Sequence, residues 1–175
     1  MMPKGIPMNL AWADAALFKF KEVADALDVD WCLFAGAALG MFRDGKWIPH
    51  DDDVDLAVKT TPEKLESLWP GLYAAGFSLG RWCENVDGTR NRHVYYRPDI
   101  PNIPDGGILV DIFYTFTPDE ENLMVSYDAV PYKDELFLVP HPIDAYLQLA
   151  YGEWWDRNNR NAAMGKEGVK VGSHG

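Results

Sequence analysis

Four aspartates lie within five residues at the start of an apolar segment. They are Asp51, Asp52, Asp53 and Asp55 in the stretch HDDDVDLAV, 50–58. Residues two apart in a β-strand point to the same face, so a strand here sets Asp53 and Asp55 side by side while Val54 and Leu56 face a core. Because carboxylates this close repel one another, the stretch is either a solvated turn or a place where a positive group binds.

A further carboxylate, Asp111, stands alone in the apolar segment ILVDIFYTF, 108–116. If the two segments form neighbouring strands, Asp53, Asp55 and Asp111 converge on one face of a sheet. Oxygen-only ligands favour a hard divalent cation, Mg²⁺ or Mn²⁺, which keeps positions for water and phosphate oxygens. Such a centre supports phosphoryl-type transfer, in which one carboxylate takes the proton of the attacking hydroxyl. In the alternative interpretation, the run from Asp51 is a solvated turn and Asp111 points outward.

A glycine and a small residue, Gly36 and Ala37, follow the apolar segment DWCLFAG, 30–36. At a junction between a strand and a helix, a glycine lets backbone amides approach a phosphate closely. A simple tight turn explains the same pair. Arg43 follows the short helix, where its planar guanidinium suits diphosphate oxygens, or else pairs with Asp44 or Asp51.

The remaining candidates for substrate contacts flank these segments. His50 and Asp51 lie at the acidic run, where His50 either pairs with an aspartate or positions a substrate. Arg92 and His93 belong to TRNRHVYYR, 89–97. Period-two alternation puts Arg92 and His93 on opposite faces of a strand, so one of these faces supplies a cation, unless this is an ordinary edge strand.

The elements that position these residues follow from periodicity and capping. The pattern indicates a mixed α/β fold rather than a helical bundle, with one domain over 1–163 and a flexible tail over 164–175. An internal proline, Pro70, is expected to bend or divide the third helix. Expected helices are 9–27, 37–45, 61–76 and 144–151, and expected strands are 30–36, 53–59, 77–82, 92–97, 108–116 and 135–140.

Composition limits the partners and the compartment. The net charge of −11 disfavours binding of DNA or RNA through phosphate neutralisation. The N-terminal segment reads as an amphipathic helix rather than a signal peptide, and no apolar stretch is long enough to span a bilayer. Cys32 and Cys83 have no metal-type spacing and are expected to be reduced core residues. Together these features favour a soluble, cytoplasmic protein.

Two segments resemble a known family. GAALGMFRDGKWIPHDDDVDLAV, 36–58, is similar to the signature of the LicD–fukutin family, within the nucleotidyltransferase (polymerase-beta-like) superfamily. HPIDAYLQLAYGEWW, 141–155, is similar to that family's C-terminal helix. The chain departs from the pattern at Ala37, where the family often has a hydroxyl residue, and at His50, where tryptophan is more usual.

The resemblance implies a small, mixed, twisted sheet with helices packed on one side. It makes Asp53, Asp55 and Asp111 ligands of Mg²⁺ and places Gly36 and Ala37 against donor phosphates, with Arg43 nearby. It also implies transfer of a phosphorylated alcohol, such as phosphocholine or an alditol phosphate, from a cytidine-diphosphate donor to an acceptor hydroxyl such as that of a glycan. The alternatives are transfer of a nucleoside monophosphate to a small molecule or protein, and a non-catalytic binding module on the same fold.

Overall fold

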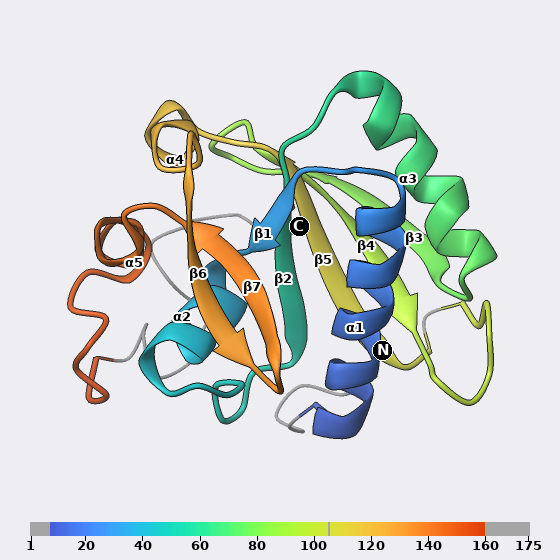
Figure 1. Cartoon of the computed structure of the whole chain (residues 1–175), viewed down its shortest axis with the longest axis horizontal. Coiled ribbons are helices and arrows are strands. Elements are labelled where there is room, and N and C mark those ends of the chain that lie inside the picture. The colour runs from blue at the N-terminus through green and yellow to red at the C-terminus, as the bar shows by residue number, and fades with distance from the viewer. Residues whose placement is uncertain (1–7, 105, 160–175) are drawn as a thin grey trace.

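The computed structural model describes residues 8–104 and 106–159 (Figure 1). The tail expected over 164–175 lies outside this range. The helices are α1 (Leu10–Ala26), α2 (Ala35–Arg43), α3 (Pro62–Ala74), α4 (Pro118–Asn122) and α5 (Ile143–Tyr151), and the strands are β1 (Trp31–Leu33), β2 (Asp53–Val58), β3 (Ser78–Glu84), β4 (Arg90–Tyr96), β5 (Ile108–Thr115), β6 (Tyr127–Tyr132) and β7 (Glu135–Pro140).

Five strands form a mixed sheet in the order β1-β2-β5-β4-β3. Strands β2 and β5 pair in parallel, and the other neighbours pair antiparallel. The two strands that carry the predicted carboxylates are therefore direct neighbours in the middle of the sheet. The mixed α/β fold predicted from the sequence is confirmed.

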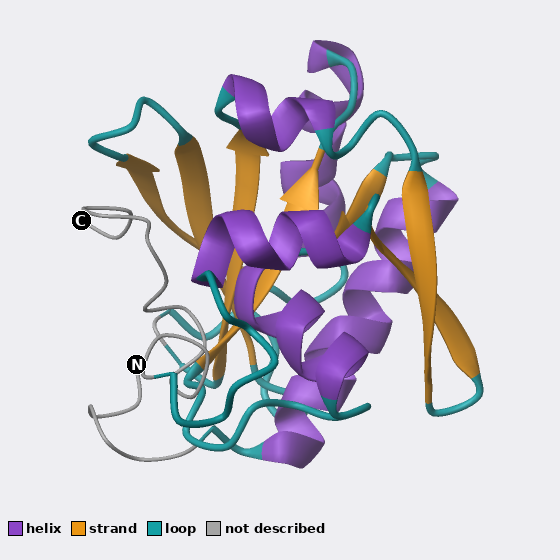
Figure 2. Cartoon of the chain, turned by 90° about the vertical axis from the view of Figure 1, so that its left-hand side faces the viewer, coloured by secondary structure: helices purple, strands orange, loops and turns teal. Residues whose placement is uncertain are grey.

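Helices α1 and α3 cover one face of this sheet and contact each other (Figure 1). The core beneath them includes Leu17 and Phe20 of α1, Leu56 of β2 and Ile112 of β5, each fully buried. Figure 2 shows further helices between the sheet on one side and the β6–β7 hairpin on the other. Burial of apolar side chains is the main stabilising contribution to such a core.

Local signals set the ends of the helices. The side chain of Asn9 accepts a hydrogen bond from the Trp12 amide at 3.1 Å, and that of Thr61 accepts one from the Lys64 amide at 3.3 Å. Both are N-caps that satisfy backbone donors of the first helical turn. Helix α3 continues past Pro70 to Ala74, so of the two expected effects, a bend or a division, Pro70 does not divide the helix.

Two elements were not predicted, β6 and α4. The turn between β6 and β7 places Lys133 and Asp134 at positive φ, which suits a two-residue hairpin turn, and Pro131 is tolerated because the sheet has only two strands. Helix α4 starts with a capping box formed by Thr117 and Glu120, a signal that is visible in the sequence TPDE.

Asp14 of α1 connects the hairpin to the rest of the molecule. Its Oδ1 accepts hydrogen bonds from the Tyr132 hydroxyl at 2.6 Å and the Trp47 indole at 2.9 Å, while Lys133 Nζ lies 2.8 Å from Oδ2. Burial by itself raises the pKa of Asp14, but the hydrogen bonds from Lys133, Tyr132 and Trp47 outweigh it and lower that pKa. The charged carboxylate therefore stabilises the docked hairpin.

Candidate functional site

The acidic run folds into a buried cluster rather than a solvated turn. Asp51, Asp53 and Asp55 are at most 2% exposed, and each offers a carboxylate oxygen within 4.8 Å of the others. At an effective dielectric constant of about 20, two unit charges at such a distance repel by roughly 3 kcal/mol. Three ionised carboxylates at this spacing therefore favour a cation among them.

Asp111 lies beside this cluster on the neighbouring strand. It is in register with Asp55 in the parallel β2–β5 pair, so the two side chains leave the sheet on the same face. The 4.8 Å cluster found within 8–104 and 106–159 includes Asp51 but not Asp111. The structure thus adds Asp51, which the sequence suggested only as a substrate contact, to the pair formed by Asp53 and Asp55.

The first turn of α2 packs directly against these carboxylates. The amide of Phe34 donates to the carbonyl oxygen of Asp55 at 3.1 Å, which holds the start of the helix beside β2. A Cβ atom built on Gly36 would meet Oδ2 of Asp51 at 2.6 Å and Oδ2 of Asp55 at 3.5 Å. Only glycine allows this approach, so the residue predicted to contact phosphate also lies at the carboxylate cluster.

A buried tyrosine of α5, Tyr146, supports this turn, and a second, Tyr151, is buried in the same helix; neither was predicted as a site residue. The hydroxyl of Tyr146 accepts a hydrogen bond from the amide of Ala35 at 2.9 Å, and Ala35 has a positive φ of 43°. Burial raises the pKa of Tyr146 and of Tyr151, and the aspartates near Tyr151 raise its pKa further. Both phenols are therefore neutral donors and acceptors in the wall of the site.

Strand β4 contributes polar groups around Asp111. The Asn91 side chain donates to Oδ1 of Asp111 at 2.5 Å, while Nε2 of His93 lies 3.8 Å from Oδ2 and 3.7 Å from Sγ of Cys83. Asn91, His93 and Cys83 are all buried. His93 was predicted as a substrate contact, and the structure places it next to Asp111; Asn91 was missed because one amide in a polar strand carries no local signal.

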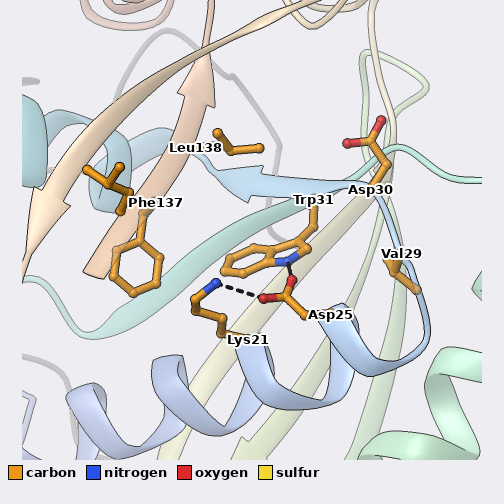
Figure 3. A pocket seen from close by; sticks show the side chains of 8 residues that line it. Lys21, Asp25, Val29, Asp30, Trp31, Phe137 and Leu138 are labelled. Carbon is orange, nitrogen blue, oxygen red and sulfur yellow. Dashed lines mark hydrogen bonds and ion pairs between the residues drawn. The ribbon is translucent and has the colours of Figure 1, made fainter. Parts of the chain in front are cut away.

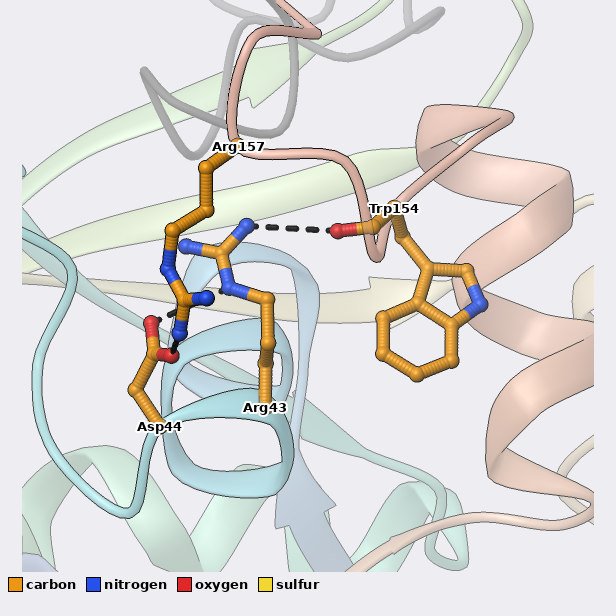
Figure 4. Close-up of polar contacts among 4 residues, drawn as sticks. All are labelled: Arg43, Asp44, Trp154 and Arg157. Carbon is orange, nitrogen blue, oxygen red and sulfur yellow. Dashed lines mark hydrogen bonds and ion pairs between the residues drawn. The ribbon is translucent and has the colours of Figure 1, made fainter.

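Arg43 lies at the opposite end of α2 from Gly36, about 10 Å along the helix axis. Its Nε donates to Asp44 at 3.0 Å and its terminal NH1 donates to the carbonyl oxygen of Trp154 at 3.2 Å (Figure 4). Arg157 pairs with the same Asp44. These hydrogen bonds of Arg43 join α2 to the segment after α5.

Arg92 lies on the face of the sheet away from Asp111. Its guanidinium carbon lies 3.9 Å from the centre of the Trp82 ring and 5.0 Å from that of Trp69 in α3, a cation–π arrangement. Its neighbour His93 faces Asp111, as the predicted alternation requires. The structure therefore does not bring Arg92 to the site. His50 is exposed in the turn before the cluster, at a positive φ of 69°.

A pocket of about 130 Å³ lies elsewhere, between α1, β1 and β7 (Figure 3). In its wall, Asp25 accepts hydrogen bonds from the Trp31 indole at 3.0 Å and from Lys21 at 2.7 Å. Pockets for drug-sized ligands usually have volumes of roughly 300 Å³ or more. This one is too small for a nucleotide-linked donor, and no predicted site residue lines it.

The carboxylate cluster fits a hard divalent cation. Its ligands are all carboxylate oxygens, which Mg²⁺ and Mn²⁺ prefer. The glycine at position 36 leaves space next to Asp51 that a side chain would fill. Asp51, Asp53 and Asp55, with Asp111 beside them, are the residues that would hold such an ion.

A mixed sheet with carboxylates on adjacent strands, next to a glycine in the first turn of a helix, is the arrangement that the resemblance to nucleotidyltransferases implied. The chain belongs to the family described as LicD/FKTN/FKRP, nucleotidyltransferase domain, whose sequence model matches residues 28–136. The family assignment made from the sequence is confirmed.

Comparison with solved structures finds two RNA terminal uridylyl transferases. One is a cytoplasmic RNA terminal U-transferase, with 17% identity and a TM-score of 0.36 over 60% of this chain and 27% of that chain. Another is Cid1, an RNA terminal uridylyl transferase, with 16% identity and a TM-score of 0.37 over 60% of this chain and 28% of that chain. This chain thus matches less than a third of either protein. A search of curated proteins finds no match.

The structure also bears on the predictions about thiols and membranes. Cys32 and Cys83 are both free and buried, as predicted. Across 8–104 and 106–159, no helix combines the length and the apolar character needed to cross a membrane.

Proposed function

We propose that this protein transfers a phosphorylated alcohol, of the phosphocholine or alditol-phosphate type, from a cytidine-diphosphate donor to an acceptor hydroxyl such as that of a glycan. The buried cluster of Asp51, Asp53 and Asp55 against Gly36 carries this proposal. Membership of the LicD/FKTN/FKRP family supports the reaction class.

The proposed ligands of Mg²⁺ or Mn²⁺ are Asp53, Asp55 and Asp111, joined by Asp51. A bound divalent cation neutralises phosphate oxygens and makes the phosphorus more electrophilic. Gly36 and Ala37 in the first turn of α2 would receive the donor phosphates, because backbone amides at a helix N-terminus favour anions. Tyr146 holds this turn through the Ala35 amide, so the phosphate-binding backbone is fixed before substrate arrives.

In the proposed reaction, the acceptor hydroxyl attacks the phosphorus that carries the alcohol. One carboxylate of the cluster takes the hydroxyl proton, a new phosphorus–oxygen bond forms to the acceptor, and the bond to the cytidylate oxygen breaks. The products are the phosphodiester-modified acceptor and CMP. Burial of the cluster excludes water, which limits hydrolysis of the donor.

A second candidate is transfer of a nucleoside monophosphate from a nucleoside triphosphate to a small molecule or protein hydroxyl. The description of the matching family domain as a nucleotidyltransferase favours it. The two reactions differ in which phosphorus is attacked, since the second releases pyrophosphate instead of CMP.

Product analysis distinguishes them. We would incubate the full chain with Mg²⁺ and either a CDP-alcohol or each nucleoside triphosphate, with candidate glycan and small-molecule acceptors, and measure CMP and pyrophosphate. We expect CMP with the CDP-alcohol, and loss of that signal in Asp53→Asn. Pyrophosphate alone would support the second candidate. Release of neither, with no Mn²⁺ binding, would favour a non-catalytic binding module.

A further inference from the structure

A series of buried side-chain hydrogen bonds runs from the β3–β4 turn to Asp111. Nδ2 of Asn85 donates to Oγ1 of Thr89 at 2.9 Å and to Oδ1 of Asn91 at 3.0 Å. Nδ2 of Asn91 then donates to Oδ1 of Asp111 at 2.5 Å. None of these four side chains is more than 5% exposed, so the series is shielded from water along its length.

The two ends of this series fix the direction of every bond in it. A carboxylate only accepts hydrogen bonds when ionised, so Asn91 must turn its amino group toward Asp111 and its carbonyl oxygen toward Asn85. At the other end, the Thr89 hydroxyl donates to Asp87 at 2.6 Å and so accepts from Asn85. Both ends require the same orientation of the Asn85 amide. The side-chain amide of Asn91 therefore has one favourable orientation, with its amino group toward Asp111 and its oxygen toward Asn85.

A fully buried asparagine is costly for stability unless its polar atoms are bonded, and an apolar residue of similar size would fill the same space at no such cost. The role of Asn91 therefore lies in its hydrogen bond to Asp111. Asp111 is the residue in register with Asp55. His93 lies near the other oxygen of Asp111. Asn91 thus contacts Oδ1 of Asp111, and His93 lies beside Oδ2.

We infer that Asn91 is a positioning residue for Asp111: its amide, oriented by Asn85, fixes the rotation of the Asp111 carboxylate in the site. This rests on the function proposed above, because it gives Asp111 a part in holding the cation. Residues that orient a metal-binding carboxylate typically change metal affinity by about 10–100-fold when they are removed.

The test measures the dissociation constant of Mn²⁺ by calorimetry on the purified full chain, with thermal unfolding of each variant recorded in parallel. Asn91→Leu keeps the branching at Cγ but has no donor, so we expect Mn²⁺ affinity to fall about tenfold or more. Asn85→Ala keeps the Asn91 contact but frees its orientation, so we expect a loss of a few-fold. Thr89→Val is the matched control: it is buried in the same series but three hydrogen bonds from Asp111, and should lower the melting temperature without changing Mn²⁺ affinity.

Equal Mn²⁺ affinity in wild type and folded Asn91→Leu would overturn the inference. If Asn91→Leu does not fold, Asn85→Ala decides, because an unchanged affinity there has the same meaning. Asp53→Asn separates this result from the proposed function. If Asp53→Asn abolishes Mn²⁺ binding while Asn91→Leu leaves it intact, only the positioning role fails; if wild type binds no Mn²⁺, both fail.

Discussion

Two glycines one turn apart in α2, Gly36 and Gly40, should respond differently to substitution by alanine. At Gly36 we expect a loss of metal affinity, and at Gly40 a loss of stability. A Cβ on Gly36 would meet a carboxylate oxygen of Asp51 at 2.6 Å, whereas a Cβ on Gly40 would meet the backbone oxygen of Lys46 at 2.5 Å and the backbone nitrogen of Ile48 at 3.0 Å. The first obstacle is the end of a side chain, which can rotate. The second is main chain, which cannot move without unfolding the turn.

The magnitudes follow from these contacts. Ordinary contact begins near 3.4 Å, so Gly36→Ala pushes the Asp51 oxygen away by about 0.8 Å. Metal–ligand distances tolerate only about 0.2 Å, so one ligand is lost and Mn²⁺ affinity should fall at least about tenfold, as when a supporting residue is removed. Alanine also favours helix by at most about 1 kcal/mol over glycine, so the metal-free variant should unfold within about 1 kcal/mol of wild type.

Gly40→Ala is the matched variant in the same helix. Its Cβ forces the backbone apart, so we expect a loss of about 1–3 kcal/mol of stability, as for overpacked cores. The assay is urea unfolding without metal, followed by calorimetric titration with Mn²⁺. If Gly36→Ala binds Mn²⁺ as wild type does, or if Gly36→Ala destabilises the metal-free fold as much as Gly40→Ala, then Gly36 does not frame a metal site.

Two further substitutions test contacts away from the carboxylate cluster. Asp14→Asn should lower stability at pH 7 by about 1–2 kcal/mol, because it weakens the charged contact with Lys133 and the hydrogen bond from Tyr132. The pKa of Asp14 is lowered in the fold. The stability that Asp14 contributes is therefore present above its unfolded pKa of about 3.9 and is lost as the pH falls through its folded pKa. Unfolding measured from pH 7 to 2 should show the gap between variant and wild type closing in acid, and a gap independent of pH would contradict this. Arg92→Met should cost about 1 kcal/mol by removing the stack on Trp82 and leave Mn²⁺ affinity unchanged; a weaker Mn²⁺ complex would mean that Arg92 reaches the site after all.

The carboxylate strand could be predicted because its pattern is local. Alternation of Asp53 and Asp55 with apolar residues specifies one polar face, and the lone Asp111 in an apolar strand specifies a second. Whether the two strands are neighbours is a long-range property. No local pattern encodes the β2–β5 pairing. The prediction of a shared face was conditional on this pairing, and the structure shows that the two strands do pair.

The partners of two candidate site residues, Arg92 and Arg43, depend on contacts distant in sequence. Arg92 is turned away from the site because Trp69 of α3 and Trp82 of β3 supply a stacking surface on the other face of the sheet. Arg43 is engaged by Asp44 and by Trp154, which lies more than a hundred residues later. Period-two alternation gave the correct faces for β4, but it could not say which face the carboxylates share.

The most direct test of the central claim is thermal unfolding of the full chain with and without Mn²⁺ or Mg²⁺. At a metal concentration 100 times the dissociation constant, binding to the native state adds about 2.7 kcal/mol, which for a chain of this size raises the melting temperature by roughly 5–10 °C. Asp53→Asn should lose this increase and, without metal, should melt at or above the wild-type temperature because one repulsive charge is gone. If neither ion raises the melting temperature of wild type, or if both raise that of Asp53→Asn equally, the buried aspartates do not form a metal centre.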